Sequence, residues 1–125
     1  MTNHITRDTV KGIVRVIKQD LLRHRDLWAA SRDLAAELEG VKAPRVLVDL
    51  REASIGVEDW EKRQFAEAHK EIIGRKARIA ALIRRQDPQY REYLHFEVLF
   101  ANLGLRVRIF DDEHRALSWL ALPVE

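Results

Sequence analysis

The chain has 125 residues, of which 46% are hydrophobic and 34% charged, and a net charge of +2 at pH 7. This length is close to the commonest size of one domain, and the apolar content suffices for a buried core. Because cysteine is absent, disulfides, thiolate metal sites and cysteine nucleophiles are excluded.

The N-terminus is polar, and no apolar run approaches the roughly 20 residues that span a bilayer. We therefore expect one domain over residues 1–125, located in the cytoplasm, with no transmembrane segment.

The first segments of the chain predict a hairpin followed by a helix. Ile5–Val10 and Ile13–Ile17 are strand-like and are separated by the turn signal Lys11-Gly12. The helix is expected over residues 20–39. Its inner stripe has spacings of three and four residues and comprises Leu27, Ser31, Leu34 and Leu38, with Trp28 and Ala35 beside it.

Two short apolar runs, Val46–Leu50 after Pro44 and Ile79–Ile83, are predicted to be central strands. Both are apolar on the two pleat faces, apart from Asp49, which is typical of buried parallel strands. Between them a helix is expected over Val57–Ile73, with acidic residues in its first turn. Its predicted inner stripe is Phe65, Ala68 and Ile72, with Val57 and Trp60 contributing at the start.

The last third of the chain predicts a helix, an edge strand and a final helix. The helix over Pro88–Leu103 carries two apolar stripes, of which a sheet needs only one. The other packs under a neighbouring helix or faces a ligand or a second subunit. Leu105–Phe110 alternates in polarity as an edge strand does, and the final helix follows Asp111–Glu113 with Ala116, Leu117 and Leu120 buried.

Glycines mark three of the helix ends. Gly40, Gly74 and Gly104 each follow a helical pattern and precede an apolar run, and glycine readily adopts the left-handed conformation that ends a helix. The predicted order is therefore β-β-α-β-α-β-α-β-α. The fold class is α/β, with five strands and about four helices.

This order, together with Val46–Arg51, the stretch Ile55–Trp60 and the tail Phe110–Leu120, resembles the STAS superfamily of sulfate transporter and anti-sigma factor antagonist domains. Within it the chain is most similar to the small SpoIIAA-like, or STAS/SEC14-like, proteins. The resemblance implies a mixed, mostly parallel sheet flanked by helices, no catalysis, and binding of a protein partner.

The resemblance also bears on regulation. Anti-sigma factor antagonists of the superfamily are switched by phosphorylation of a serine at the start of the helix after the central strand. The matching stretch here, Gly56–Trp60, contains neither serine nor threonine, and Glu58 or Asp59 takes that place. A phosphoserine switch is therefore not expected. The SEC14-like proteins imply an alternative function, the carriage of an apolar ligand such as a lipid.

Two surfaces are candidate sites. Ligands of open α/β sheets bind beyond the carboxyl ends of the strands. The candidate partner surface is therefore Asp49, Arg51, Ser54, Glu58, Asp59 and Trp60, although Asp49 alternatively caps loop amides. Ser54, expected in a loop, is either a phosphosite near Arg51 or an ordinary loop hydroxyl. The candidate apolar ligand or dimer face is Tyr90, Tyr93, Phe96 and Phe100.

Several other patterns carry little chemistry. His24-Arg25-Asp26 matches a kinase triplet, but the chain has no room for the other parts of a kinase. Glu92 and His95 lack the second pair that a two-metal helical site needs. No cofactor or metal is expected.

The arginine-rich cluster, by contrast, has two interpretations, an anion-binding patch or a solvated rim of strand ends and loops. No nucleic-acid partner is expected, because the basic excess is small and no reading motif is present. The cluster comprises Arg75, Lys76, Arg78, Arg84, Arg85 and Arg91.

Overall fold

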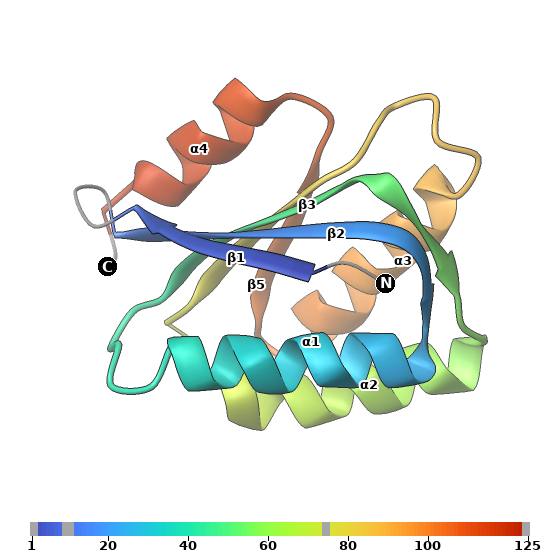
Figure 1. Ribbon diagram of the computed structural model, residues 1–125, viewed down its shortest axis with the longest axis horizontal. Coiled ribbons are helices and arrows are strands. Elements are labelled where there is room, and N and C mark those ends of the chain that lie inside the picture. Colours follow the sequence, from blue (N-terminus) through green and yellow to red (C-terminus); the bar gives the residue numbers. More distant parts are fainter. Residues whose placement is uncertain (1–2, 9–11, 74–75, 124–125) are drawn as a thin grey trace.

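A five-stranded sheet in the order β1-β2-β3-β4-β5 separates two layers of helices (Figure 1). The first strand is antiparallel to the second, and the remaining pairs are parallel. The strands are β1 (Asn3–Asp8), β2 (Ile13–Arg23), β3 (Arg45–Gly56), β4 (Arg78–Leu82) and β5 (Arg106–Phe110). The helices are α1 (His24–Glu37), α2 (Asp59–Ile73), α3 (Tyr90–Asn102) and α4 (Glu113–Ala121). The predicted α/β class and element order are confirmed.

The structure is a computed structural model that describes residues 3–8, 12–73 and 76–123. The predicted turn residue Lys11, the helix stop at Gly74, and Arg75 of the basic cluster lie outside the described residues, as does the side chain of Ile72. Gly40 and Gly104 have φ angles of 80° and 79°, which confirms the prediction that these two glycines end helices in the left-handed region.

The predicted boundary between the second strand and the first helix was wrong. β2 continues to Arg23, and β3 continues past Leu50 to Gly56. The two extensions pair with each other over Gln19–Arg23 and Glu52–Gly56, so each satisfies the other's backbone groups. Local patterns do not reveal this pairing, because the partner lies more than thirty residues away in the chain.

The extended part of β3 has a side-chain partner on its other edge. The Gln89 side chain donates through Nε2 to the Ile55 carbonyl at 2.7 Å and accepts from the Ile55 amide at 2.7 Å. This amide takes the place of a neighbouring strand, because β4 ends at Leu82 and does not reach so far.

A β-bulge interrupts the pairing of β2 and β3. Ile17 lies opposite Asp49 and Gln19 opposite Glu52, so Lys18 lies opposite both Leu50 and Arg51. A bulge of this kind shifts the alternation of the strand that carries the extra residue. The core-facing residues of β3 therefore change from even to odd positions and are Val46, Val48, Leu50, Ala53 and Ile55.

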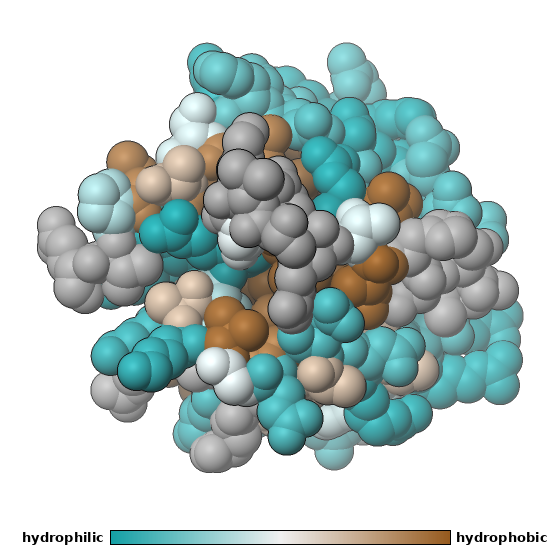
Figure 2. Space-filling view, turned by 60° about the vertical axis from the view of Figure 1, so that its left-hand side comes forward, coloured by the Kyte–Doolittle hydropathy of each residue, from teal (hydrophilic) through white to brown (hydrophobic). Residues whose placement is uncertain are grey.

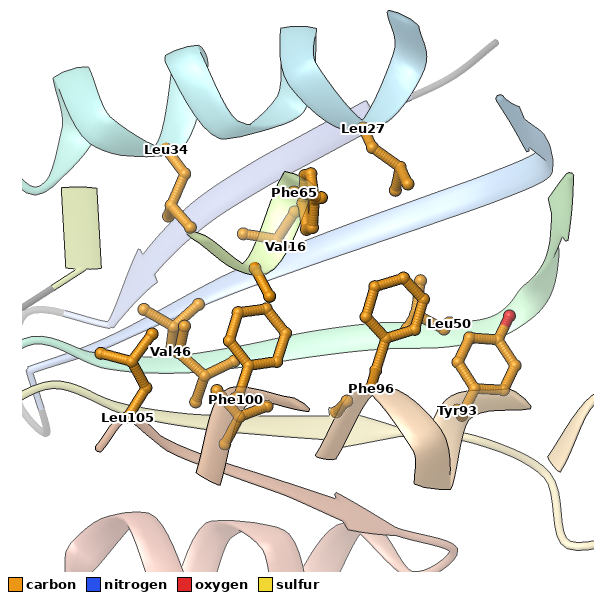
Figure 3. Packing of buried hydrophobic residues seen from close by; sticks show 14 of the residues in the cluster. Val16, Leu27, Leu34, Val46, Leu50, Phe65, Tyr93, Phe96, Phe100 and Leu105 are labelled. Atoms are coloured by element: carbon orange, nitrogen blue, oxygen red, sulfur yellow. The ribbon is translucent and has the colours of Figure 1, made fainter. Parts of the chain in front are cut away.

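Two hydrophobic clusters hold the layers together. The larger lies between the sheet and the helices α1, α2 and α3, and Figure 3 shows Leu27 and Leu34 of α1 facing Phe96 and Phe100 of α3 across it. The smaller lies under α4 and includes Leu47 of the sheet. The predicted α1 stripe of Leu27, Ser31, Leu34 and Leu38 is buried, as expected.

The inner face of α2 differs from its prediction. Trp60 was expected in the core but is 60% exposed, because the helix begins at Asp59 and its first turn projects beyond the sheet. The face that is buried comprises Lys62, Phe65, Ala66 and His69. Lys62 is only 1% exposed; its ammonium group contacts Glu92 of α3 and lies 3.3 Å from Asp59.

The two stripes of α3 have different environments. Phe96 and Phe100 pack edge-on against Phe65 of α2, with ring centroids 6.2 and 6.5 Å apart. The second stripe instead reaches the surface, where Leu94 and Val98 are exposed. Of the two apolar stripes, the one with Phe96 and Phe100 packs against α2, and the one with Leu94 and Val98 is exposed.

A buried arginine fixes the end of α4. Arg78, 7% exposed, donates to the carbonyl oxygens of Trp119, Leu122 and Pro123. It is therefore not part of a surface anion site. Arg84 and Arg85 are also engaged, in contacts with Glu52 and Asp111. These contacts favour the interpretation of the basic cluster as a rim of strand ends and loops.

We predict that Arg78→Lys lowers the free energy of unfolding by about 2 kcal/mol, because a lysine cannot satisfy three carbonyls in a fixed fork. Arg45→Lys is the matched control, since the half-buried Arg45 reaches the same Leu122 carbonyl through a single, longer contact of 3.4 Å. Urea denaturation measures both. Equal effects of the two substitutions would contradict the role given to Arg78.

Candidate functional site

The candidate partner surface that was predicted from the sequence is divided into two parts in the structure. Asp49 and Arg51 lie on the α4 side of the sheet, where Arg15 and Glu113 complete a network of charges. Glu58, Asp59 and Trp60 lie at the start of α2, beyond the far end of β3.

Asp49 is a structural carboxylate. It accepts hydrogen bonds from the Arg51 amide at 3.1 Å, from Nε at 3.0 Å and from Nη2 at 2.8 Å. Burial alone would raise the pKa of Asp49, but the hydrogen bonds from Arg51 and the charges of Arg51 and Arg15 lower it overall. These contacts favour the interpretation that Asp49 caps a backbone amide. Its carboxylate is engaged by Arg51 and is not free to bind a partner or ligand.

Ser54 is a strand residue, so its expected loop position was wrong. It is exposed and pairs with Leu21 of β2. The bulge turns it away from the large cluster, toward the face that carries α4.

The start of α2 gathers acids around a tryptophan. The Trp60 indole donates to Glu58 Oε2 at 3.0 Å, and the Glu58 amide donates to Glu61 Oε1 at 3.0 Å. Asp59 contacts the ammonium group of Lys62. The result is an exposed aromatic ring held within a negatively charged helix start.

The predicted apolar face of α3 lies inside the protein. Tyr93, Phe96 and Phe100 are buried, and Tyr90 is half-buried. The first three cannot serve as a dimer face, which contradicts that part of the prediction. They instead line a cavity of about 120 Å³ between the sheet and the helices α1, α2 and α3, which is partly open to the surface.

The wall of this cavity is almost wholly apolar, with four polar side chains. Aliphatic and aromatic residues of the sheet and of the helices α1, α2 and α3 surround it, including Leu27, Leu50 and Phe65. The polar side chains in the wall are Lys18, Ser31, His69 and Tyr93. On the face drawn in Figure 2, hydrophobic residues also reach the surface in a hollow bordered by hydrophilic ones.

Lys18 is the charged member of this wall. It follows Val14 and Val16 on the side of β2 that faces the helices, and the bulge holds it opposite Leu50 and Arg51. No hydrogen bond or ion pair engages its ammonium group among the described residues. The side chain retains some accessible area, yet the surrounding protein atoms lower its pKa to about 8 by desolvation.

Ser31 and His69 form a buried pair across α1 and α2. The serine oxygen lies 2.6 Å from Nε2 of the imidazole and 2.8 Å from the Leu27 carbonyl, so its single proton is shared between these two acceptors. Nδ1 of the imidazole lies 2.8 Å from the Phe65 carbonyl and donates to it. Desolvation, opposed by that hydrogen bond and assisted by the charge of Lys18, lowers the pKa of His69 to about 4, so the ring is neutral at pH 7.

Tyr93 also lines this cavity, and its hydroxyl is a hydrogen-bond donor without an acceptor among the described residues. Its side chain is 3% exposed, and its hydroxyl has no hydrogen-bond partner within the described residues. Figure 3 shows the ring standing beside Phe96 and pointing into the interior. Desolvation raises the pKa of Tyr93, so the hydroxyl stays protonated and able to donate. A buried hydroxyl without a hydrogen-bond partner is costly, so this hydroxyl is a candidate donor to a bound ligand.

The remaining sequence patterns have structural explanations. Asp26 of the kinase-like triplet accepts from the Arg23 amide at 3.0 Å and so caps α1. Glu92 contacts Lys62 instead of a metal. Within the described residues, no three histidine, aspartate or glutamate side chains are grouped as metal ligands. Nor does any described helix combine the length and apolar character needed to cross a bilayer.

Three solved structures share this architecture. An uncharacterised protein of the DUF3478 family from Shewanella loihica, described as having a SpoIIAA-like fold, matches with a TM-score of 0.59 and 20% identity over 95% of this chain and 92% of that one. The chain therefore has a SpoIIAA-like fold. The unphosphorylated anti-sigma factor antagonist SpoIIAA matches with a TM-score of 0.59 and 12% identity, over 95% and 97% of the two chains.

A STAS domain protein from Planctomyces limnophilus matches with a TM-score of 0.57 and 14% identity, over 96% of this chain and 98% of that one. No family model and no curated protein matches the sequence. The SpoIIAA-like fold that the sequence predicted is thus confirmed by structure.

Sequence reasoning missed Lys18, Ser31 and His69 as members of a site. A signal for Lys18 was present, because it continues the alternation of Val14 and Val16 on one face of the strand. Ser31 was placed correctly on the inner stripe of α1. The facing position of His69 required the packing of α2 against α1, which no local pattern gives.

The neutral His69 makes stability depend on pH. The unfolded chain binds this proton near pH 6.5 and the folded protein only near pH 4, so the contribution is present above pH 6.5 and is lost as the pH falls toward 4. We predict that His69→Gln removes about 2 kcal/mol of the difference in unfolding free energy between pH 7 and pH 5. Urea denaturation at both pH values measures it. The exposed control His114→Gln should leave the difference unchanged, and an unchanged difference in His69→Gln would contradict the burial of this ring.

Proposed function

We propose that the protein is a non-enzymatic regulatory module of STAS type, which binds a protein partner through the start of α2 and works without a phosphoserine switch. The fold supports this proposal, since one protein that shares it is named an anti-sigma factor antagonist and is described in an unphosphorylated form. The segment Gly56–Trp60 carries no hydroxyl group that a kinase could modify.

The observation that carries the proposal is the exposed tryptophan at the start of α2. Trp60 is the most exposed of the large hydrophobic residues described, and the carboxylates of Glu58, Asp59 and Glu61 lie around it. Exposed tryptophans are frequent energetic centres of protein interfaces. A rim of fixed negative charge favours a partner with an apolar pocket bordered by lysine or arginine.

Comparative affinity purification from cells that produce the protein tests this surface. We predict that Trp60→Ala reduces the captured partner at least tenfold, because truncating a central aromatic residue commonly costs about 2 kcal/mol or more. The control Leu122→Ser removes a similarly exposed hydrophobic residue from the end of α4 and should capture the same partner as the wild type.

Light scattering of the same variants identifies the partner when it is a second copy of the chain. A dimer that Trp60→Ala converts to a monomer supports binding through this surface. A monomer that captures nothing contradicts the proposal, as does a dimer or captured partner that Trp60→Ala leaves unchanged.

A second function, the carriage of a small apolar molecule, is supported by the cavity lined by α3. A cavity of about 120 Å³ with an apolar wall and a few polar groups has the character of a ligand pocket. We predict that native mass spectrometry of the purified protein shows an added mass that denaturation releases. Observation of the bare chain alone, together with no response to added apolar compounds, would contradict this function.

A further inference from the structure

Resting on the second of these functions, we infer that the cavity binds a small hydrophobic carboxylate, with the carboxylate at Lys18 and the apolar body among the rings of α2 and α3. The ligand class is an aromatic or short aliphatic monocarboxylate.

The charge of Lys18 determines the head group. Lys18 lines the wall of an apolar cavity, and no hydrogen bond or ion pair engages its ammonium group among the described residues, an arrangement that is costly for the empty protein. Lys18 also borders a polar hollow with Asp49 and Glu52, but these carboxylates are already engaged, Asp49 by Arg51 and Arg15, and Glu52 by Arg84. An anionic ligand would supply the missing partner, and a charge-assisted hydrogen bond to it would be strong in this environment.

One further donor reaches the same cavity. The unpartnered Tyr93 hydroxyl is available to a carboxylate oxygen or to another acceptor on the ligand. His69 is neutral, and its ring nitrogens are engaged by Ser31 and the Phe65 carbonyl, so it adds no competing charge. A cationic ligand would instead meet Lys18 with no carboxylate in the wall to receive it.

The size of the cavity limits the apolar body. An engineered cavity of about 150 Å³ holds one benzene molecule, so a space of about 120 Å³ suits one ring or a chain of similar volume. The two acyl chains of a phospholipid do not fit in this volume. The edge-on rings of Phe65, Phe96 and Phe100 form an aromatic wall for such a body.

Three probes with one skeleton test the inference: phenylacetate, 2-phenylethanol and 2-phenylethylamine, which carry an anionic, a neutral and a cationic head. Isothermal titration calorimetry should show phenylacetate binding at least tenfold more tightly than the alcohol, and the amine more weakly than both. Lys18→Met keeps the apolar stem and removes the charge. It should lower phenylacetate affinity at least tenfold and leave alcohol affinity within about twofold.

Lys70→Met is the matched control, because Lys70 is an exposed lysine of α2 outside the cavity. Tyr93→Phe should weaken phenylacetate less than Lys18→Met does. Should Lys18→Met fail to fold, the order of the three probes in the wild type still decides the inference.

The outcomes separate this inference from the functions on which it rests. If the alcohol binds as tightly as the acid, or if an uncharged ligand co-purifies, the proposed carboxylate head group is overturned. The carrier function is then still supported. Binding of none of the three probes at millimolar concentration, with no co-purifying ligand, overturns both. Partner capture through Trp60 is unaffected by either result.

Discussion

The parallel pairing of β2 with β3 decides which side chains enter the interior of this protein. Because successive strand residues point to opposite faces, a shift of one residue would exchange the two faces along the whole strand. The bulge opposite Lys18 makes such a shift within β3. It lets the strand extend to Gly56 while Ala53 and Ile55 remain in the core.

The same pairing distributes the charges near the centre of the sheet. On the α4 side, Arg15, Asp49, Arg51 and Glu113 neutralise one another. On the other side, Lys18 faces an apolar cavity alone. A fully paired network stabilises a fold, whereas a desolvated charge without a partner and an unsatisfied buried hydroxyl weaken it. Proteins retain such groups mainly at functional sites, which is why the cavity and not the Asp49 network is the ligand site we propose.

The order of elements and the inner stripe of α1 could be predicted from the sequence, because both rest on local periodicity and on glycines such as Gly40 and Gly104. The extension of β3 could not, since it depends on pairing with β2 and on the amide of Gln89. Trp60 was assigned to the core because its spacing matched the stripe of α2, yet the helix begins too late for its first turn to reach the sheet. The site was found in part: Tyr93, Phe96 and Phe100 were named, whereas Lys18 and His69 required the packed structure.

The proposed ligand site depends above all on Lys18 being held in the cavity wall as an unpaired, desolvated cation. Nuclear magnetic resonance of the lysine side chains, with Lys18→Met to assign the signal, measures its titration directly. The structure predicts a midpoint near pH 8 for Lys18. A midpoint near the ordinary lysine value of about 10.4 would show a solvated ammonium group and contradict the proposed cavity site.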